Sequence, residues 1–493
     1  MSGEDIRNIR FAKMQRLAER FGSAFPSEIA RTHTTAEVSG NFKTLLKKKR
    51  LTLTVAGRVR AIRGHGGATF VDIDDGTGKI QIYLKKDDIG DELYGAFEGN
   101  IDVGDIVEVT GTPFLTKRKE PTVLVSNWRP LAKGLAPLPD SWVGLQDMEE
   151  RFRTRALDLL TNEDTRARFK RRRDTIATMR KFLEKEGFEE VETPILQPMY
   201  GGALARPFET FHNALGEKLY MRIAPELYLK RLIVGGMPRV FEIGKNFRNE
   251  GIDVSHSPEF TELEGYMAYE DRASLELFLE RMVMAVVKQV VGNLSFTFDG
   301  ETIKIKKPFK RIKFMDAIKE YALLPGVESM NMEELKAATE RLGIQVGRAM
   351  SRGKLLDEIF KKAVRKHLMS PTFVTHHPLD ISPLAKAAPG GQYADRVQLI
   401  IGGQEVMNAY AELNDPLEQR KRFEGQEELR KSGDLEAVSV DENYLETMEY
   451  GMPPTAGFGI GVDRFVQLLT DTHNVREVIL FPLLRTKKEG EQE

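Results

Sequence analysis

The segment RVFEIGKNFRNEGIDVSHSPEFTELEGYMAY (Arg239–Tyr269) decides the predicted fold. Apolar and polar residues alternate in RVFEIG and again in FTELEGYMAY, and alternation with a period of two is typical of β-strands. The residues between these runs are rich in Asn, Gly and Asp, which favour loops. We therefore predict a long antiparallel hairpin. The strands and helices around it do not alternate regularly, which favours an α+β fold.

This hairpin carries side chains that suit a nucleotide. Arginine offers a rigid fork for phosphate or carboxylate oxygens, phenylalanine offers a stacking plane for a base, and glutamate accepts from an exocyclic amine. A hairpin with ordinary surface ion pairs is an equally good interpretation of this segment alone. The candidate residues in or near its tip and on one face are Arg248, Glu250, His256, Phe260, Glu264 and Tyr266.

A second segment, GFGIGVDRF, places glycines at positions 457, 459 and 461 and an arginine at 464. The spacing differs from the dinucleotide-binding pattern G-x-G-x-x-G. Glycine at alternate strand positions removes the side chains from one face, so that a flat ligand or another backbone can approach. Arg464, in the first turn of the following helix, can then stack on that ligand or meet a phosphate. A simple packing contact is an equally common explanation.

The rest of the chain divides into ranges of different character. Residues 51–135 contain about five short strands, which suit a small closed barrel of the oligonucleotide-binding (OB) type. Residues 1–50 precede it as a helical segment, and residues 136–150 follow it as a proline-containing linker. Residues 151–493 mix strands with helices. Within them, residues 311–368 look wholly helical, as an insertion would.

Composition excludes several classes of protein. The 73 basic and 74 acidic residues cancel, so nucleic-acid binding must rest on local patches. The absence of cysteine excludes disulfides, thiol nucleophiles and cysteine-ligated metals. The most apolar stretch, from Arg281, is short and contains Lys288, and the first residues are polar, so we expect a cytoplasmic protein without a membrane partner. The run RARFKRRR (Arg166–Arg173) is typical of a solvated face, with a partner subunit or RNA backbone as the alternative.

Taken together, these segments resemble motifs two and three of the class II aminoacyl-tRNA synthetases. Three further tracts make the chain similar to the bacterial-type lysyl-tRNA synthetases of subclass IIb: IAPELYLKRLIVGG (Ile223–Gly236), QEVMNAYAELNDP (Gln404–Pro416) and YGMPPTAGFGIGVDR. The resemblance covers nearly the whole chain. It implies an N-terminal OB-fold anticodon-binding barrel and a catalytic domain with an antiparallel sheet flanked by helices. It also implies a homodimer, formed through the helix before Pro194 as motif one.

The resemblance implies ATP-dependent activation of L-lysine to lysyl-adenylate, with Mg²⁺, and transfer of the lysyl group to the 3′-terminal adenosine of tRNA(Lys). It implies that Arg248 holds the α-phosphate of ATP and the carboxylate of lysine. It also implies that Arg464 and Phe260 stack on opposite faces of the adenine ring. Arg248 and Arg464 are the implied catalytic residues. The residues implied for ATP are Arg248, Glu250, His256, Phe260, Glu405 and Arg464. Those implied for lysine are Gly202, Glu226, Glu264, Tyr266, Asn408, Tyr410 and Glu412. Those implied for the anticodon are Arg63, Phe70, Gln81 and Glu120.

Elementary electrostatics agrees with lysine as the ligand. Lysine carries two ammonium groups and one carboxylate, so its pocket needs several carboxylates and a cation. Glu226, Glu264 and Glu412 with Arg248 supply that set. A site of this kind rejects neutral amino acids, because one of its carboxylates would be left buried and unpaired. For each glutamate, a structural ion pair is the competing explanation.

The sequence departs from the family at one metal ligand. The family binds magnesium through two glutamates seven residues apart; Glu405 matches the second, whereas Gln398 occupies the position of the first. An amide oxygen can still ligate Mg²⁺ but brings no charge, so we expect a weaker site. Asp395 is a possible but poorly placed substitute.

Two other functions stay open from sequence. A lysine ligase that acts on a protein would share the catalytic motifs, but the predicted anticodon barrel argues against it. A catalytically impaired RNA-binding or regulatory paralogue is the other possibility. Gln398 is the only residue that favours this paralogue.

Overall fold

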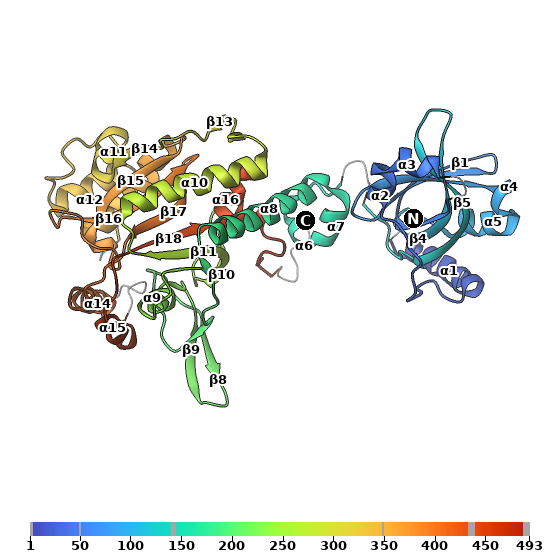
Figure 1. The fold of residues 1–493 in the computed structure, drawn as a ribbon. Helices are drawn as coiled ribbons and strands as arrows, with labels where there is room; N and C mark the ends of the chain where they lie inside the picture. Colours follow the sequence, from blue (N-terminus) through green and yellow to red (C-terminus); the bar gives the residue numbers. More distant parts are fainter. Residues whose placement is uncertain (1–2, 49–50, 140–143, 348–349, 432–438, 487–493) are drawn as a thin grey trace. The chain divides into compact units, whose positions relative to one another are not determined.

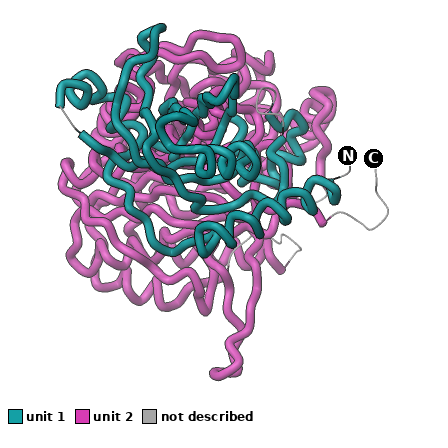
Figure 2. The backbone as a smooth tube through the Cα atoms, turned by 90° about the vertical axis from the view of Figure 1, so that its right-hand side faces the viewer, with its two compact units in different colours: residues 1–162 teal, residues 163–493 magenta. Residues whose placement is uncertain are grey.

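The computed structural model describes residues 3–48, 51–139, 144–347, 350–431 and 439–486. Small parts of the predicted N-terminal segment, linker and insertion lie outside these ranges, namely residues 1–2, 49–50, 140–143 and 348–349. The chain forms two compact units, residues 1–162 and 163–493, which Figure 2 colours separately.

The first unit contains the predicted five-stranded barrel, of which β1, β4 and β5 are labelled in Figure 1. The barrel closes in the strand order β1-β2-β3-β5-β4, and its core includes alternate residues of β2 and β3: Val71, Ile73, Ile82 and Leu84 are all buried. The OB-type prediction is confirmed. The barrel strands are β1 (Leu53–His65), β2 (Ala68–Asp74), β3 (Lys79–Lys85), β4 (Ile106–Leu115) and β5 (Pro121–Ala132). The helices of this unit are α1 (Gly3–Phe21), α2 (Thr35–Gly40), α3 (Phe42–Lys47), α4 (Lys86–Ile89), α5 (Asp91–Asn100), α6 (Met148–Arg153) and α7 (Arg155–Thr161).

The second unit is built on an eight-stranded, mainly antiparallel sheet with the order β14-β15-β16-β17-β18-β11-β10-β6. Its strands are β6 (Glu189–Glu190), β10 (Arg239–Phe247), β11 (Glu259–Ala268), β14 (Lys310–Lys313), β15 (Thr372–Pro378), β16 (Tyr393–Ile401), β17 (Gln404–Ala411) and β18 (Thr455–Gly461). A separate three-stranded sheet and a hairpin lie beside it. They consist of β7 (Leu196–Gln197), β8 (Glu209–His212) and β9 (Glu217–Met221), and of β12 (Ser295–Phe298) and β13 (Glu301–Lys304).

Helices cover both faces of the large sheet (Figure 1). The largest core cluster joins the helices α8 (Glu163–Lys185), α10 (Arg272–Val291) and α16 (Val462–Thr470) to one face. On the opposite face, α9 (Glu226–Val234) packs through a separate cluster that includes Val240 and Tyr266. The site described below lies on this second face. The remaining helices and helical turns of the second unit are α11 (Phe314–Tyr321), α12 (Met332–Arg341), α13 (Arg352–Ile359), α14 (Pro416–Lys431), α15 (Glu442–Glu449), η1 (Phe360–Val364), η2 (Arg365–His367), η3 (Leu379–Ile381) and η4 (Val475–Val478).

The predicted hairpin is confirmed as β10 paired antiparallel with β11. The glycine-spaced segment is confirmed as strand β18 leading into α16, and β18 lies between β11 and β17. Because cross-strand partners share a face, Gly457 lies beside Tyr266 and Gly459 beside Glu264. The glycines therefore leave space for the polar side chains of both neighbouring strands.

The prediction that residues 311–368 are wholly helical is wrong at their start. Residues 310–313 form β14, which pairs in parallel with β15 and packs Ile312 against the core of the insertion. Only three residues of β14 fall within the predicted range, which is too few to show the period of two that is typical of a strand. The pairing of β14 with β15 is therefore visible only in the structure. In the described part of the insertion, α11, α12, α13 and the turns η1 and η2 follow, as predicted.

Several arginines of the run in α8 pair inside the second unit: Arg168 with Glu477 (3.1 Å) and Arg172 with Asp463 (2.5 Å). Among the residues that the structure describes, every helix is too short or too polar to cross a lipid bilayer.

Candidate active site

Two adjoining cavities lie on the sheet face that carries α9. The larger has a volume of about 810 Å³ and the smaller about 180 Å³. Both are lined by Arg248, Glu262, Glu405, Asn408 and Gly459, so these residues mark the junction. A ligand in one cavity therefore meets a ligand in the other beside Arg248.

The smaller cavity brings together every residue implied for ATP. Arg248 lies over the Phe260 ring, with its guanidinium carbon 4.8 Å from the ring centroid, and its Nε is buried without a hydrogen-bond partner. Arg464 contributes a guanidinium nitrogen 3.4 Å from Nε2 of His256. Cationic and aromatic groups at such a site suit an anionic nucleotide. The implied residues that line it are Arg248, Glu250, His256, Phe260, Glu405 and Arg464.

The buried carboxylate of Asp463 links the elements that line the smaller cavity. It accepts a hydrogen bond from the Thr261 backbone N–H (2.9 Å) and pairs with Arg172 of α8 (2.5 Å). Thr261 follows Phe260 in β11, and Asp463 precedes Arg464 in α16. One buried carboxylate therefore holds the two residues predicted to sandwich adenine on neighbouring elements, and Arg172 satisfies its second oxygen.

The larger cavity contains most of the residues implied for lysine. Gly202 adopts φ +87°, and a Cβ there would lie 2.9 Å from Cβ of Glu226, so only glycine lets this loop approach α9. The exception is Glu412, which is buried outside the cavity lining, behind Gly457. The implied residues that line the cavity are Gly202, Glu226, Glu264, Tyr266, Asn408 and Tyr410.

A lysine of the chain itself, Lys230, joins two of the three predicted glutamates. Its ammonium group is fully buried, donates to Glu226 Oε1 (2.6 Å) and pairs with Glu412. Tyr410 donates to the same Glu226 oxygen at 2.5 Å. Together, the carboxylates of Glu226, Glu264 and Glu412 and this one ammonium group carry a net formal charge of −2. That charge matches the two ammonium groups of lysine.

Burial raises the pKa values of two glutamates at this pocket, Glu264 and Glu412. Desolvation, together with the charges of Glu262 and Glu226, raises the pKa of Glu264 well above its usual value, although the Tyr266 hydroxyl donates to it at 3.1 Å. Burial also raises the pKa of Glu412, against the opposing effect of Lys230. A bound cation would lower both pKa values and draw the carboxylates into their charged forms.

Glu262, which the sequence reading did not single out, lies at the junction of the cavities. Its carboxylate accepts from Asn246 at 2.7 Å and lies 4.0 Å from Arg248. Burial raises its pKa, whereas Arg248 lowers it. Strand periodicity could have found this residue, because Glu262 and Glu264 are two positions apart on one face of β11.

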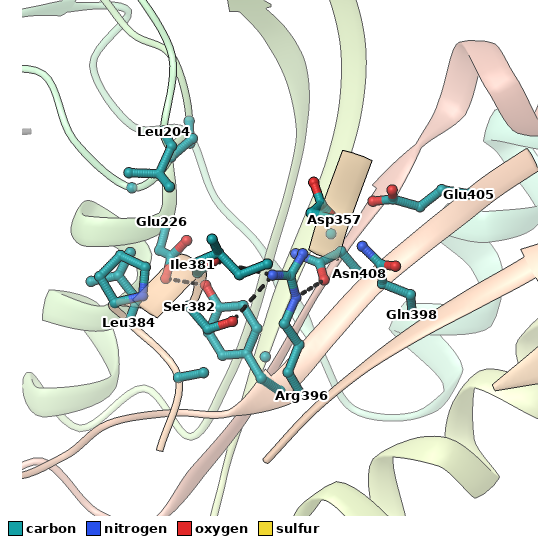
Figure 3. Close-up of a pocket in the computed structure, with 18 of the residues that line it drawn as sticks. Leu204, Glu226, Asp357, Ile381, Ser382, Leu384, Arg396, Gln398, Glu405 and Asn408 are labelled. Carbon is teal, nitrogen blue, oxygen red and sulfur yellow. Dashed lines mark hydrogen bonds between the residues drawn. The ribbon is translucent and has the colours of Figure 1, made fainter. Parts of the chain in front are cut away.

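Gln398 and Glu405 reach the larger cavity from neighbouring strands (Figure 3). A β-bulge between β16 and β17 pairs Ile400 with Glu405, so Val406 turns into the core and Glu405 turns towards the cavity. The Oε1 atom of Gln398 is buried without a hydrogen-bond partner, and Glu405 has no hydrogen bond or ion pair among the described residues. Unpaired oxygens of this kind suit a hard cation.

Asp395 does not take part in this arrangement. Its carboxylate pairs with Arg272 at 2.5 Å and is absent from the cavity lining. Arg396, its neighbour, instead donates to Asn408 (2.8 Å) and to Ser382 (3.2 Å), as Figure 3 shows. Within the described ranges there is no group of three or more His, Asp or Glu residues arranged to hold a metal.

Comparisons with known proteins now bear on this geometry. Residues 147–485 match the family model described as tRNA synthetases class II (D, K and N), and residues 53–131 match the OB-fold nucleic acid binding domain. The chain belongs to the class II tRNA synthetases. It is 44% identical to the lysine–tRNA ligase of Carboxydothermus hydrogenoformans, covering 98% of each chain. It is also 44% identical to the lysine–tRNA ligases of Chloroflexus aurantiacus (99% of this chain, 100% of the relative) and Enterococcus faecalis (98% of each).

The barrel of this class II synthetase presents the four residues implied for the anticodon around one surface. Arg63 pairs across the strands with Phe70, and Phe70 stacks on Tyr83 with ring centroids 4.4 Å apart. Arg63 also forms a double hydrogen bond with Asp72, at 2.8 and 3.0 Å. Gln81 is buried and accepts from Thr122 (2.9 Å). Glu120 is exposed immediately before β5, and its charge contributes to the raised pKa of Arg63. An aromatic ring flanked by hydrogen-bonding groups suits an unpaired base.

Proposed function

We propose that the protein is a lysine–tRNA ligase, which activates L-lysine with ATP and transfers the lysyl group to the 3′-terminal adenosine of tRNA(Lys). One observation carries this proposal: the cavity lined by Glu226 and Glu264 adjoins the cavity that all six residues implied for ATP line, and Arg248 stands at the junction. The names of the curated relatives point to the same reaction.

In the first step, a carboxylate oxygen of lysine attacks the α-phosphorus of ATP. A bond forms between that oxygen and the α-phosphorus, the bond to the β-phosphate oxygen breaks, and pyrophosphate leaves. Arg248 lies where both reacting groups meet, so its guanidinium offsets the repulsion between carboxylate and phosphate. Phe260 and Arg464 hold the adenine between them. No side chain has to act as a general base, because the nucleophile is already a carboxylate.

In the second step, the terminal 3′-hydroxyl of the tRNA attacks the carbonyl carbon of lysyl-adenylate. The new ester bond forms as the bond to the phosphate oxygen breaks, AMP leaves with the electron pair, and the proton of the hydroxyl group is transferred to the departing phosphate. The product is lysyl-tRNA. The barrel would select the tRNA through Arg63, Phe70, Gln81 and Glu120, which contact single-stranded bases by stacking and hydrogen bonding.

Specificity for lysine follows from the charges of the pocket. Glu226, held by Lys230 and Tyr410, would receive the α-ammonium group beside Gly202, and Asn408 would contact the carboxylate. Glu264 and Tyr266 would contact the ε-ammonium group, and Glu412 would add its negative charge from behind Gly457. A neutral side chain in that position would leave buried carboxylates unpaired, a penalty that rejects it strongly.

Glu405 and Gln398 would hold Mg²⁺ against the phosphates of ATP, since both present unpaired oxygens to the cavity. The ion supplies positive charge that offsets the charge of the phosphates. Gln398 contributes no charge of its own, so these two residues alone would bind Mg²⁺ weakly. We further propose a homodimer formed through α8 and cytoplasmic localisation, where the tRNA substrate is charged.

ATP–pyrophosphate exchange with each of the twenty amino acids tests the proposal, followed by charging of purified tRNA(Lys). We expect exchange with lysine alone and transfer to the tRNA. Exchange with no amino acid would favour a regulatory RNA-binding paralogue instead. Lysine-dependent exchange without tRNA charging would favour a ligase with a protein acceptor.

A further inference from the structure

Arg396 is a cation of the larger cavity to which the proposed reaction gives no role. It lies on β16 next to Val397, which faces the core, so that Arg396 and Gln398 face the cavity. On the neighbouring strand β17, Asn408 is the cross-strand partner of Gln398, and Tyr410 is the partner of Arg396. Arg396 and Asn408 are therefore diagonal neighbours on the cavity face of the sheet.

Contacts at two ends fix the guanidinium group of Arg396 (Figure 3). Its Nε donates to Oδ1 of Asn408 at 2.8 Å. Its Nη1 donates to the backbone oxygen of Ile381 and to the hydroxyl oxygen of Ser382, both at 3.2 Å. Because the group is planar and rigid, the contacts at Nη1 set the direction in which Nε points. A hydrogen bond from a charged donor is also roughly twice as strong as a neutral one.

This contact decides which end of the Asn408 amide faces the cavity. Arginine has only donors, so it must meet the oxygen of the amide. Asn408 lines both cavities, and its amide nitrogen has no partner among the residues that the structure describes. Arg396 therefore leaves the N–H groups of Asn408 available at the junction, where Arg248 also lies.

The carboxylate of lysine needs this end of the amide. An ionised carboxylate only accepts hydrogen bonds, so the oxygen of an amide turned the other way would repel it. The two ends of an asparagine amide have nearly the same size and shape, so packing alone does not choose between them. A partner that can only donate makes the choice. A water molecule could not do so, because it both donates and accepts.

We propose that Arg396 is a positioning residue for lysine: its Nε–H fixes the Asn408 amide with the N–H groups towards the carboxylate of the amino acid. The inference rests on the proposed function, which places that carboxylate beside Asn408 and Arg248. Arg396 itself touches neither the carboxylate nor the phosphate. Its effect should therefore appear in the affinity for lysine.

Two substitutions of equal length separate the hydrogen bond from the charge of Arg396. Glutamine has a nitrogen at the position along the side chain that Nε occupies in arginine, whereas methionine has a methyl group there. Lysine binding to the full-length protein is measured by calorimetry without ATP. We expect Arg396→Met to raise the dissociation constant of lysine by about tenfold or more, as loss of an orienting partner does at metal sites. Arg396→Gln keeps the donor and should stay within about threefold of the wild type.

A ligand without the carboxylate provides the matching control. Cadaverine (1,5-diaminopentane) carries two ammonium groups at the ends of a five-carbon chain and has no carboxylate, so Arg396→Met should bind it within about twofold of the wild type. Asn408→Ala should weaken lysine binding by itself. Arg396→Met added to Asn408→Ala should weaken it by no more than about twofold further, because both residues act through one contact.

A second arginine controls for the loop that Arg396 holds. Arg422 of α14 donates to the backbone oxygens of Ser382 (3.3 Å) and Ala385 (2.5 Å), so it fixes the same loop from the other side. None of its hydrogen bonds within the described ranges goes to Asn408. We expect Arg422→Met to change lysine affinity by less than about threefold.

Four results would each overturn the proposal: wild-type lysine affinity in Arg396→Met, equal losses in Arg396→Met and Arg396→Gln, an equal loss for cadaverine, or an equal loss in Arg422→Met. If Arg396→Met does not fold, as judged by its melting temperature, Asn408→Asp replaces it. Arg396 would then hold one carboxylate oxygen and the other would repel the carboxylate of lysine. Lysine affinity should fall by about 100-fold or more while cadaverine affinity does not fall, and unchanged lysine affinity would overturn the proposal.

Lysine-dependent exchange by the wild-type protein is measured in parallel. Exchange together with wild-type lysine affinity in Arg396→Met would refute only this inference. Lysine binding that depends on Arg396, without exchange, would refute only the proposed function.

Discussion

Gly457→Ala is the sharpest test of the lysine pocket. A Cβ at this position would lie 2.1 Å from Glu412 Oε1 and 2.5 Å from the Tyr266 ring. Both neighbours are buried, at 1% and 3% exposure, so neither can move into solvent. Carbon and oxygen atoms need more than 3 Å, and the Glu412 carboxylate would therefore shift by about 1 Å relative to its partner Lys230.

The expected result has two parts. Overpacking of this buried site should lower the free energy of unfolding by about 1–3 kcal/mol. A displacement of about 1 Å in groups that position a substrate weakens its productive binding by about 100-fold, so the KM for lysine should rise by that order. The KM for ATP should change little, because Gly457 does not line the smaller cavity.

The same strand offers matched controls. At Gly459 the nearest atom to a new Cβ is Glu262 Oε1 at 3.2 Å, and at Gly461 it is Arg464 Cβ at 3.8 Å, an ordinary contact. ATP–pyrophosphate exchange at varied lysine and varied ATP, with a thermal melt of each variant, should rank the defects as Gly457→Ala, then Gly459→Ala, then Gly461→Ala. A wild-type KM for lysine in Gly457→Ala, or equal defects in Gly457→Ala and Gly461→Ala, would refute the reasoning.

Three more predictions follow from the same structure. Because the pKa of Glu264 is raised, lysine binding should release protons from the protein. Lysine affinity should therefore increase as pH rises towards that pKa and level off above it. Calorimetry in two buffers of different ionisation enthalpy measures the proton release, and zero release contradicts the prediction. Lys230→Met should lower the free energy of unfolding by about 3–5 kcal/mol, because Glu226 and Glu412 lose their shared buried partner; a denaturant melt within 1 kcal/mol of the wild type would show that the pair is dispensable. Phe70→Ala should reduce tRNA(Lys) charging efficiency by about 5- to 150-fold through loss of about 1–3 kcal/mol of base stacking, while lysine-dependent exchange stays at the wild-type rate; a fall in exchange would mean that the barrel does not act on tRNA alone.

Local patterns in the sequence were enough to predict much of this molecule. The period of two in Arg239–Tyr269 predicted β10 and β11, and the alternating glycines predicted β18 and the space beside it. The five short strands predicted the barrel. All six residues implied for ATP line one cavity, because they lie on β11, on β17, on the loop between β10 and β11, and at the start of α16. Neighbouring positions in these elements are set by backbone geometry, which the sequence pattern records directly.

Only the tertiary structure could reveal which distant charges meet. Glu226 and Tyr410 are 184 positions apart, and nothing in the local pattern of α9 showed that Lys230 would lie between Glu226 and Glu412. Asp357 reaches the cavity from a helix whose apolar side determines its orientation, and a single bulge turns Glu405 towards it. Such contacts depend on how whole elements pack, because burial alone makes an isolated charge unstable and thereby selects its partner. The sequence by itself therefore determined the elements and the types of side chain they carry, and packing decided which of those side chains share a site.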